Sequence, residues 1–148
     1  MADIRQATSE DVHEVERVVA AAYEPWIAVL GGRPIPMDAD YAALVDEGTV
    51  SLVETEGAIA AVLVLEHHDD HLLLENVAVD PGAQGRGLGS HLLAHVEEEA
   101  RARALPEVRL YTNVLMASNI AWYERHGFVW TSEDGTPPRR RVWLTKRL

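Results

Sequence analysis

The stretch Val77–Ala100, VAVDPGAQGRGLGSHLLAHVEEEA, joins a strand end, a glycine-rich loop and a helix. Val77-Ala78-Val79 is apolar and β-branched, as at the end of a buried strand, and Asp80-Pro81-Gly82 breaks it. The first N–H groups of a helix have no internal partner and carry the positive end of its dipole. Because glycine lets a ligand approach those donors closely, the stretch predicts a site for a phosphorylated ligand. Apolar residues recur at helical spacing behind the loop, at Leu88, Leu92, Val96 and Ala100.

The spacing of the glycines discriminates between kinds of phosphate loop. A P-loop ends in Gly-Lys-Ser/Thr, and no Lys occurs between residues 77 and 100. A dinucleotide-binding G-x-G-x-x-G would need glycine at position 90, where Ser90 stands. The pattern that remains is Gln-x-x-Gly-x-Gly, at 84–89, and it resembles the acyl-CoA pyrophosphate loop of the GNAT superfamily of N-acyltransferases. A tight strand-to-helix turn without a ligand is the alternative.

The resemblance implies that acetyl-CoA is the co-substrate and that no metal takes part. In the family, the strand before the loop splays open and its backbone hydrogen-bonds the pantetheine amides, a form of strand addition. Its N–H groups would also polarise the thioester carbonyl. The matching strand positions are Val77, Ala78 and Val79, and those of the loop are Gln84, Gly85, Arg86, Gly87, Leu88, Gly89 and Ser90.

A second motif, between Leu110 and Phe128, extends the resemblance. Asn119 and Tyr123 are four residues apart and share one helical face ahead of a Gly-Phe strand start. In relatives, that Asn contacts the CoA arm and that Tyr lies near the sulfur. Many members place the Asn seven residues before the Tyr, where this chain has Met116, so the assignment of Asn119 departs from the family pattern. The alternative for Tyr123 is a half-buried aromatic that hydrogen-bonds the backbone.

Acetyl transfer to an amine poses two proton problems. The leaving thiolate corresponds to a thiol with a pKa of ~8.5, and a phenol with a pKa of ~10 can donate a proton to it, so Tyr123 is the expected acid. The acceptor ammonium, with a pKa of ~10.4, must lose a proton. We expect Glu75 to be the base, because period-two alternation places it on the same strand face as Val77 and Val79. Some aminoglycoside-modifying relatives have a glutamate at the matching place. Since an ordinary Glu has a pKa of ~4.3, it would need burial or a bridging water, and a solvated or ion-paired Glu75 is the alternative.

The rest of the chain predicts an α/β (α+β) fold of the GNAT type. We expect a mixed, mostly antiparallel sheet of six to seven strands, with helices on both faces and the strand–glycine loop–helix unit at its centre. Residues 1–148 are expected to form a single acetyltransferase domain. The expected strands are 4–7, 50–54, 58–66, 72–79, 108–112, 128–130 and 141–146. The expected helices are 12–23, a short one that Asp38 caps, the one behind the glycine loop, and 117–126.

The segment between the first two helices combines many Gly and Pro residues with a large apolar load. It predicts either a substrate wall or a helix docked on the core. As substrate-binding candidates we name Tyr23, Trp26, Asp38 and Tyr41, with Asp40 beside them, because acids there would favour a cationic amine.

The amino-acid composition limits the kinds of partner that we expect for this protein. The net charge is −11, from 24 acidic and 13 basic residues, which disfavours nucleic acids and anionic membranes. No cysteine and no run of eighteen apolar residues occurs, so we expect a cytoplasmic protein without a thiolate nucleophile. Direct attack by the amine in a ternary complex is therefore the expected scheme. Dimers are common in the family, so the resemblance leaves a homodimer open.

The run His67-His68-Asp69-Asp70-His71 has the residue types of a metal site. Successive residues on an extended chain point to opposite faces, so we expect a polar turn between strands.

Two functions follow from the motifs. The first is an N-acetyltransferase that acts on a primary amine of a small molecule or peptide. The second is a non-catalytic acyl-CoA-binding regulatory protein of the same fold, and the combination of Glu75 and Tyr123 favours the enzyme.

Overall fold

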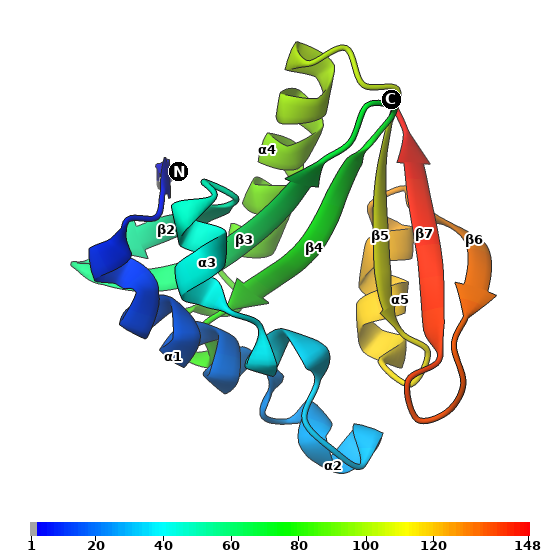
Figure 1. Ribbon diagram of the computed structural model, residues 1–148, viewed down its shortest axis with the longest axis horizontal. Coiled ribbons are helices and arrows are strands. Elements are labelled where there is room, and N and C mark those ends of the chain that lie inside the picture. Colours follow the sequence, from blue (N-terminus) through cyan, green and yellow to red (C-terminus); the bar gives the residue numbers. More distant parts are fainter. Residues whose placement is uncertain (1–2) are drawn as a thin grey trace.

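The computed structural model describes residues 3–148, which contain one seven-stranded sheet in the order β1-β2-β3-β4-β5-β7-β6 (Figure 1). Only β4 and β5 pair in parallel within these residues, and the other neighbours are antiparallel. The predicted mixed, mostly antiparallel sheet is confirmed. The strands are β1 (Ile4–Gln6), β2 (Val50–Thr55), β3 (Ala58–His67), β4 (Leu72–Val79), β5 (Glu107–Asn113), β6 (Val129–Asp134) and β7 (Arg141–Arg147).

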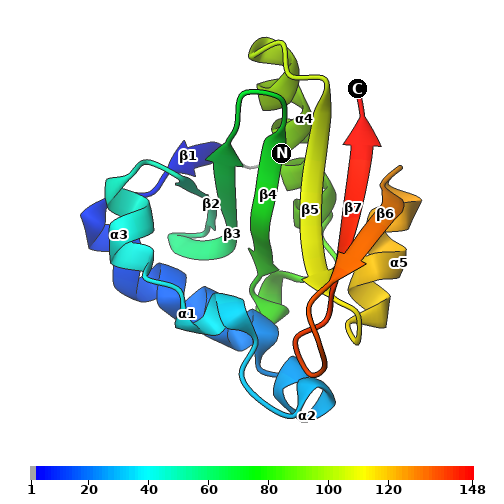
Figure 2. The ribbon, with the colours of Figure 1, turned by 45° about the vertical axis from the view of Figure 1, so that its right-hand side comes forward.

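Helices cover both faces of the sheet, as Figure 2 shows with α4 and α5 behind it and α1 and α3 on the other side. Leu92 of α4 and Ile120 of α5 pack with Leu74 in one buried cluster, whereas Val15 of α1 packs with Leu52 in the other. The apolar stripes read from the sequence therefore face the two sides of one sheet. The helices are α1 (Val12–Tyr23), α2 (Trp26–Leu30), α3 (Tyr41–Asp46), α4 (Leu88–Ala102) and α5 (Ala117–Arg125).

The segment after α1 differs in detail from the prediction. The short helix α2 forms within the expected loop, and a 3-10 turn, η2 (Ile35–Asp38), follows it. The cap of α3 is Asp40, whose Oδ1 accepts from the Ala43 N–H at 3.1 Å, so the prediction of Asp38 as the cap is wrong. Asp38 belongs to the preceding turn, where it pairs with Arg33.

The strands β4 and β5 separate after a short contact. Their pairing covers Leu72–Leu74 against Val108–Leu110 and does not extend to the later residues of either strand. The open edge of β4 therefore runs from residue 75 to residue 79, which confirms the splay that the family resemblance implied. It leads directly to the glycine-rich loop.

A β-bulge on β4 lies at the start of this splay. On β3, Val64 faces Asn76 and Leu65 faces Leu74, so Glu75 is an extra residue without a partner. A bulge bends its strand and interrupts the alternation of side chains. Leu74 and Val77 consequently contact the same core cluster although they are three residues apart. The prediction that Glu75 shares a face with Val77 and Val79 is wrong for this reason.

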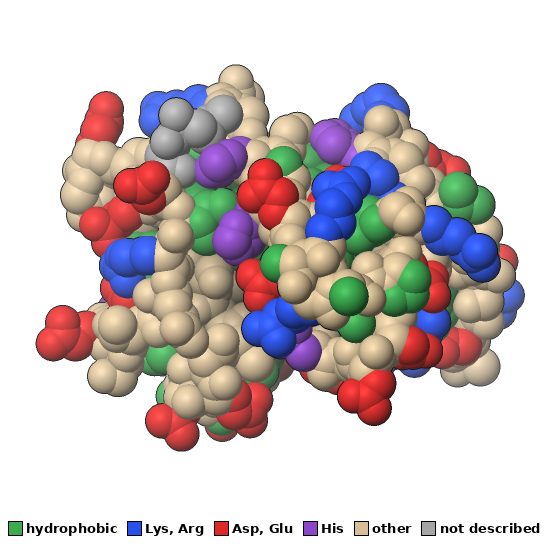
Figure 3. Space-filling view, turned by 90° about the horizontal axis from the view of Figure 1, so that it is seen from above, with side chains coloured by type: hydrophobic (Ala, Val, Ile, Leu, Met, Phe, Trp, Pro, Cys, Tyr) green, Lys and Arg blue, Asp and Glu red, His purple; other side chains and the backbone are tan. Residues whose placement is uncertain are grey.

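The surface carries mixed charge. On the end of the molecule that Figure 3 displays, Asp and Glu side chains of the described residues are spread over the face, with Lys and Arg side chains among them. No helix in residues 3–148 is both long and apolar enough to cross a membrane.

Candidate active site

Two cavities meet at Tyr123. The first, of about 610 Å³, lies along the glycine-rich loop, and we call it the loop cavity. The second, of about 330 Å³, lies between η2, β4, β5 and the start of β7, and we call it the sheet cavity. Three side chains line both: Tyr23, Asn119 and Tyr123. Two ligands that enter from different sides would therefore meet at these residues.

The loop cavity brings together nearly all of the residues that were predicted to bind the cofactor. Arg86 is the exception, because its Nη2 turns back to the Gly82 carbonyl oxygen at 3.5 Å and the side chain does not line the cavity. The residues that do line it are Val77, Ala78, Val79, Gln84, Gly85, Gly87, Leu88, Gly89, Ser90, Asn119 and Tyr123.

Backbone donors are available in this cavity. Within the described part of the chain, the N–H groups of residues 85–90 donate no hydrogen bond, and the ladder of α4 begins with His91 donating to the Gly87 carbonyl at 3.0 Å. Gly85 and Gly87 have φ of 80° and 77°, a conformation that other residues adopt only with strain. The loop thus presents unpaired donors at a helix N-terminus, which fits a diphosphate.

The third glycine of the motif has another purpose. A Cβ on Gly89 would lie 2.9 Å from Cζ2 of Trp122, so the glycine lets α4 pack closely against α5. The Trp122 ring is itself held by His126 and Tyr123, with ring centroids 4.5 Å and 5.0 Å away. Gly85 and Gly87 thus set the backbone conformation of the loop, whereas Gly89 is required for the close contact between α4 and α5.

Gly89→Ala is expected to destabilise the fold by about 1–2 kcal/mol. Overpacking costs about 1–3 kcal/mol, and the higher helix propensity of alanine offsets up to about 1 kcal/mol of this. Gly32→Ala is the matched control, because no atom lies within 4 Å of its added Cβ, and we expect a change below about 0.5 kcal/mol. Urea unfolding of both variants checks this, and equal stabilities would contradict the packing role of Gly89.

A serine–histidine pair lies at the N-terminus of α4. His126 Nδ1 is 2.8 Å from the Trp122 carbonyl oxygen, which can only accept, so this nitrogen carries the proton. Nε2 of a neutral ring then accepts from the Ser90 hydroxyl at 3.0 Å. Sequence reasoning did not anticipate this pair. It also missed Arg125, which lines the loop cavity and has no carboxylate partner in residues 3–148.

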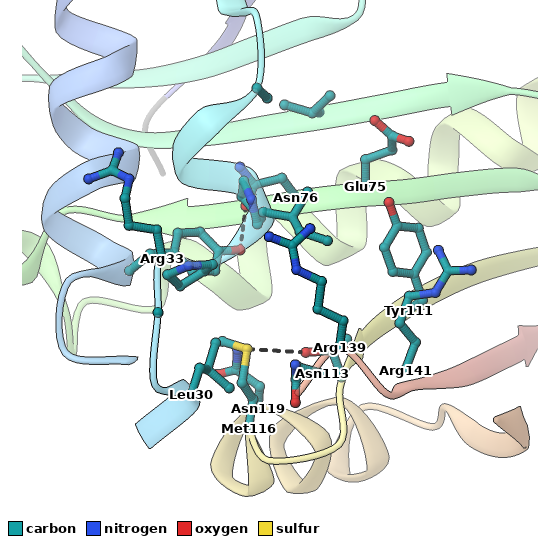
Figure 4. Close-up of a pocket in the computed structure, with 18 of the residues that line it drawn as sticks. Leu30, Arg33, Glu75, Asn76, Tyr111, Asn113, Met116, Asn119, Arg139 and Arg141 are labelled. Atoms are coloured by element: carbon teal, nitrogen blue, oxygen red, sulfur yellow. Dashed lines mark hydrogen bonds between the residues drawn. The ribbon is translucent and has the colours of Figure 1, made fainter. Parts of the chain in front are cut away.

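The sheet cavity holds the other predicted site residues only in part. Tyr23, Tyr41 and Glu75 line it, and Figure 4 shows the position of Glu75 on its wall. Trp26 lines the loop cavity instead, because α2 follows α1 directly and runs along that side. Asp38 lines neither cavity and is 59% exposed in its ion pair with Arg33.

Asn76 organises the wall of the sheet cavity, and the sequence analysis did not single it out. It is the one buried polar or charged residue in the described chain. Its Oδ1 accepts from the Tyr23 hydroxyl at 2.5 Å, and its Nδ2 donates to the Tyr41 hydroxyl at 3.1 Å. Tyr41 in turn donates to the Pro36 carbonyl at 2.6 Å. The hydroxyls of both tyrosines are thus held by this network, which fixes α1, α3 and η2 against β4.

Tyr123 is buried between the two cavities. Phe128 and Trp122 hold its ring edge-on, with centroids 5.7 Å and 5.0 Å away. Its hydroxyl makes no hydrogen bond to the residues that the structure describes, so the alternative of a backbone-bonded tyrosine finds no support. Burial raises the pKa of Tyr123 far above its usual range, so the hydroxyl keeps its proton.

Glu75 is half-buried at the bulge, and the hydroxyl of Tyr111 points toward this residue (Figure 4). Burial raises the pKa of Glu75, and the neighbouring Glu66 carboxylate raises it further through a hydrogen bond and through charge. His68 opposes this shift in the pKa of Glu75. A carboxyl group with a raised pKa accepts a proton more readily than an ordinary glutamate.

The histidine run between β3 and β4 is divided among separate acids. His67 Nε2 lies 3.2 Å from Glu99, and His71 Nδ1 lies 2.7 Å from Asp70. In residues 3–148, no group of three or more metal-ligating side chains is placed to hold an ion.

Known proteins share this fold. A family model described as the acetyltransferase (GNAT) family matches residues 12–128. The PaiA N-acetyltransferase of Thermoplasma acidophilum, solved in complex with coenzyme A, superposes with a TM-score of 0.85 at 15% identity and covers 100% of this chain and 99% of that chain. At that identity the likeness shows the fold alone.

Two curated relatives match this chain over part of their own length. The amino-acid acetyltransferase of Ralstonia nicotianae is 32% identical over 140 residues, which cover 93% of this chain and 29% of that protein. The ribosomal protein bS18-alanine N-acetyltransferase of Escherichia coli is 38% identical over 72 residues, 49% of each sequence. The chain therefore matches less than half the length of either relative. From the family match over residues 12–128, the chain belongs to the GNAT acetyltransferase family.

Proposed function

We propose that residues 1–148 act as one domain that transfers an acetyl group from acetyl-CoA directly to a primary amine of a small molecule or peptide. The observation that carries this proposal is the meeting of the loop cavity and the sheet cavity at Tyr123. A thioester that enters along the glycine loop and an amine that enters through the sheet cavity would meet there. This geometry suits a ternary complex, in which proximity supplies much of the rate.

The loop cavity would hold coenzyme A. The N–H groups of residues 85–90 would bind the diphosphate, and Arg125, which has no carboxylate partner among the described residues, would add a cation for a phosphate. The open edge of β4 after Leu74 would bind the pantetheine amides as an added strand. A backbone N–H on this edge would polarise the thioester carbonyl.

Tyr123 would stabilise the leaving thiolate. An ordinary phenol would match the thiol in pKa, but burial raises the pKa of Tyr123 and makes complete proton transfer less favourable. We therefore assign Tyr123 as a hydrogen-bond donor to the developing sulfur anion, with partial proton transfer. Hydrogen bonds to charged groups are worth about 1.5–3 kcal/mol.

Glu75 would remove a proton from the amine, through a water if the carboxylate does not reach it. The raised pKa of Glu75 narrows the gap to an alkylammonium of ~10.4 without closing it. Ser90 is not assigned a covalent role, because its hydroxyl lies in the first turn of α4, beside the donors that we assign to the diphosphate.

The relatives suggest where to look for the acceptor. Their names specify an amino acid in one case and the alanine of a ribosomal protein in the other. Free amino acids, and peptides with an N-terminal alanine, are accordingly the first acceptors to test for this chain.

A thiol-release assay with acetyl-CoA and a panel of amines tests the proposed function. We expect release of coenzyme A that depends on one class of amine, with double-reciprocal plots that intersect, as a ternary complex requires. Tight binding of coenzyme A without turnover on any amine would favour the alternative, a regulatory acyl-CoA-binding protein. Accumulation of an acetylated enzyme in the absence of an acceptor would contradict direct transfer.

A further inference from the structure

Arginine side chains predominate among the charged residues on the wall of the sheet cavity. The sequence contains 24 acidic and 13 basic residues, yet the charged side chains that line this cavity are three arginines and one glutamate. The acids that the sequence analysis placed near a substrate are used elsewhere, Asp38 in an ion pair and Asp40 as a helix cap. The wall therefore does not match a simple cationic amine.

Two of the three arginines already have carboxylate partners. Arg33 Nε lies 2.9 Å from Asp38 Oδ1. Arg141 pairs with Asp134 through two contacts, of 2.8 Å and 2.9 Å, and its guanidinium stacks 4.8 Å from the Tyr111 ring centroid. Both guanidinium groups are therefore already paired with a carboxylate.

Arg139 differs from both. Its guanidinium has no carboxylate partner among residues 3–148, in a chain where acids outnumber bases. Figure 4 shows its side chain extending into the cavity toward Asn76. An anion in the cavity could therefore reach a guanidinium without displacing another acid.

The backbone around Arg139 is fixed by the neighbouring loop. Asn113 Nδ2 donates to the Pro138 carbonyl at 2.9 Å, and the Val114 N–H donates to the Arg140 carbonyl at 3.0 Å. Within the turn, the Arg139 N–H donates to the Thr136 carbonyl at 2.8 Å. The turn between β6 and β7 is thus attached to the end of β5, which keeps Arg139 over the cavity.

We propose that the acceptor is a small amino acid-type molecule, whose carboxylate binds Arg139 while Glu75 faces its amine. This inference rests on the proposed function and names its substrate class. A guanidinium can bind a carboxylate through two parallel hydrogen bonds, which fix its orientation. Glu75, on the wall of the same cavity, supplies the opposite charge for an ammonium. A volume of about 330 Å³ is at the small end for ligand pockets, and it suits a single amino acid better than a long peptide.

The test is an acceptor panel of the twenty standard amino acids and their C-terminal amides, with acetyl-CoA. For the preferred amino acid, we expect the wild-type kcat/KM to exceed that for its amide by about 10 to 100-fold, the effect of one charge-assisted pair. Arg139→Ala should reduce this ratio to near one and leave the KM for acetyl-CoA unchanged. Arg139→Lys, which keeps the charge and loses the two-point contact, should retain part of the preference.

Arg140→Ala is the matched control. Arg140 is the next residue in the same turn, does not line the cavity, and pairs with Glu133 at 2.7 Å. This variant should keep the wild-type ratio, so a general disturbance of the turn can be recognised.

Calorimetric titration of the coenzyme A-loaded protein with the same panel separates failure of the inference from failure of the proposed function. Selective binding of acids over amides without any turnover would support the carboxylate site and overturn only the acetyltransferase assignment. Amides that bind or react as well as acids would overturn the inference. So would acetylation confined to amines without a carboxylate, to peptide N-termini, or a panel with no binding at all.

Discussion

Tyr123→Phe is expected to lower kcat for acetyl transfer by about 10²-fold, at the lower end of the range for a lost general acid. We expect this smaller decrease in kcat because the pKa of Tyr123 is raised, so its proton is shared with the thiolate and not fully transferred. The substitution keeps the ring that packs against Trp122 and Phe128. The hydroxyl bonds none of the described residues, so stability should change little. Steady-state kinetics and thermal unfolding check both statements.

Tyr111→Phe provides the comparison. Tyr111 lines the sheet cavity but not the loop cavity, so its hydroxyl cannot serve a thiolate there in the same way. We expect a loss of kcat of about 10-fold or less, within the range of one neutral hydrogen bond. Equal losses for the two variants would remove Tyr123 from its assigned role.

Glu75→Gln is expected to lower kcat/KM by about 10²–10³-fold, in keeping with a lost general base. The wild-type kcat/KM should fall at acid pH as Glu75 takes up a proton, and this limb should lie above the usual Glu pKa of ~4.3, because burial and Glu66 raise the pKa of Glu75. The variant should lose this limb. Glu66→Gln should move it to lower pH, since the neighbouring carboxylate would be gone.

The raised pKa of Glu75 also predicts that Glu75→Gln, which lowers activity, increases the stability of the fold at high pH. A carboxyl whose pKa is raised by folding favours the folded state below its unfolded pKa, and this contribution is lost as pH rises through the folded pKa. Glutamine does not ionise. Glu75→Gln should therefore match the wild type in melting temperature at about pH 4 and exceed it at about pH 8. A variant that is equally active, or less stable at the higher pH, would contradict the assignment of Glu75.

The site could be predicted from the sequence where it depends on neighbouring residues. The strand end, the glycines and the first turn of α4 lie within Val77–Ala100, so their pattern determines their geometry directly. The same holds for Tyr123 and Asn119, which are one helical turn apart on α5. Short-range spacing and helix geometry were sufficient for these residues.

Features that depend on pairing between distant segments could not be predicted in this way. The bulge at Glu75 arises from its register with Val64 and Leu65 on β3, which no local pattern of β4 records. Arg139 reaches the sheet cavity only because Asn113 attaches the turn between β6 and β7 to the end of β5. Asn76 acquires its importance from two tyrosines that lie 53 and 35 residues earlier in the chain.

Calorimetric titration with coenzyme A and with pantetheine, which lacks the nucleotide diphosphate, tests the central claim that the backbone donors of residues 85–90 bind that diphosphate. We predict that coenzyme A binds at least about 10²-fold more tightly than pantetheine, a difference of roughly 3 kcal/mol. Equal affinities, or no measurable binding of coenzyme A, would contradict the account.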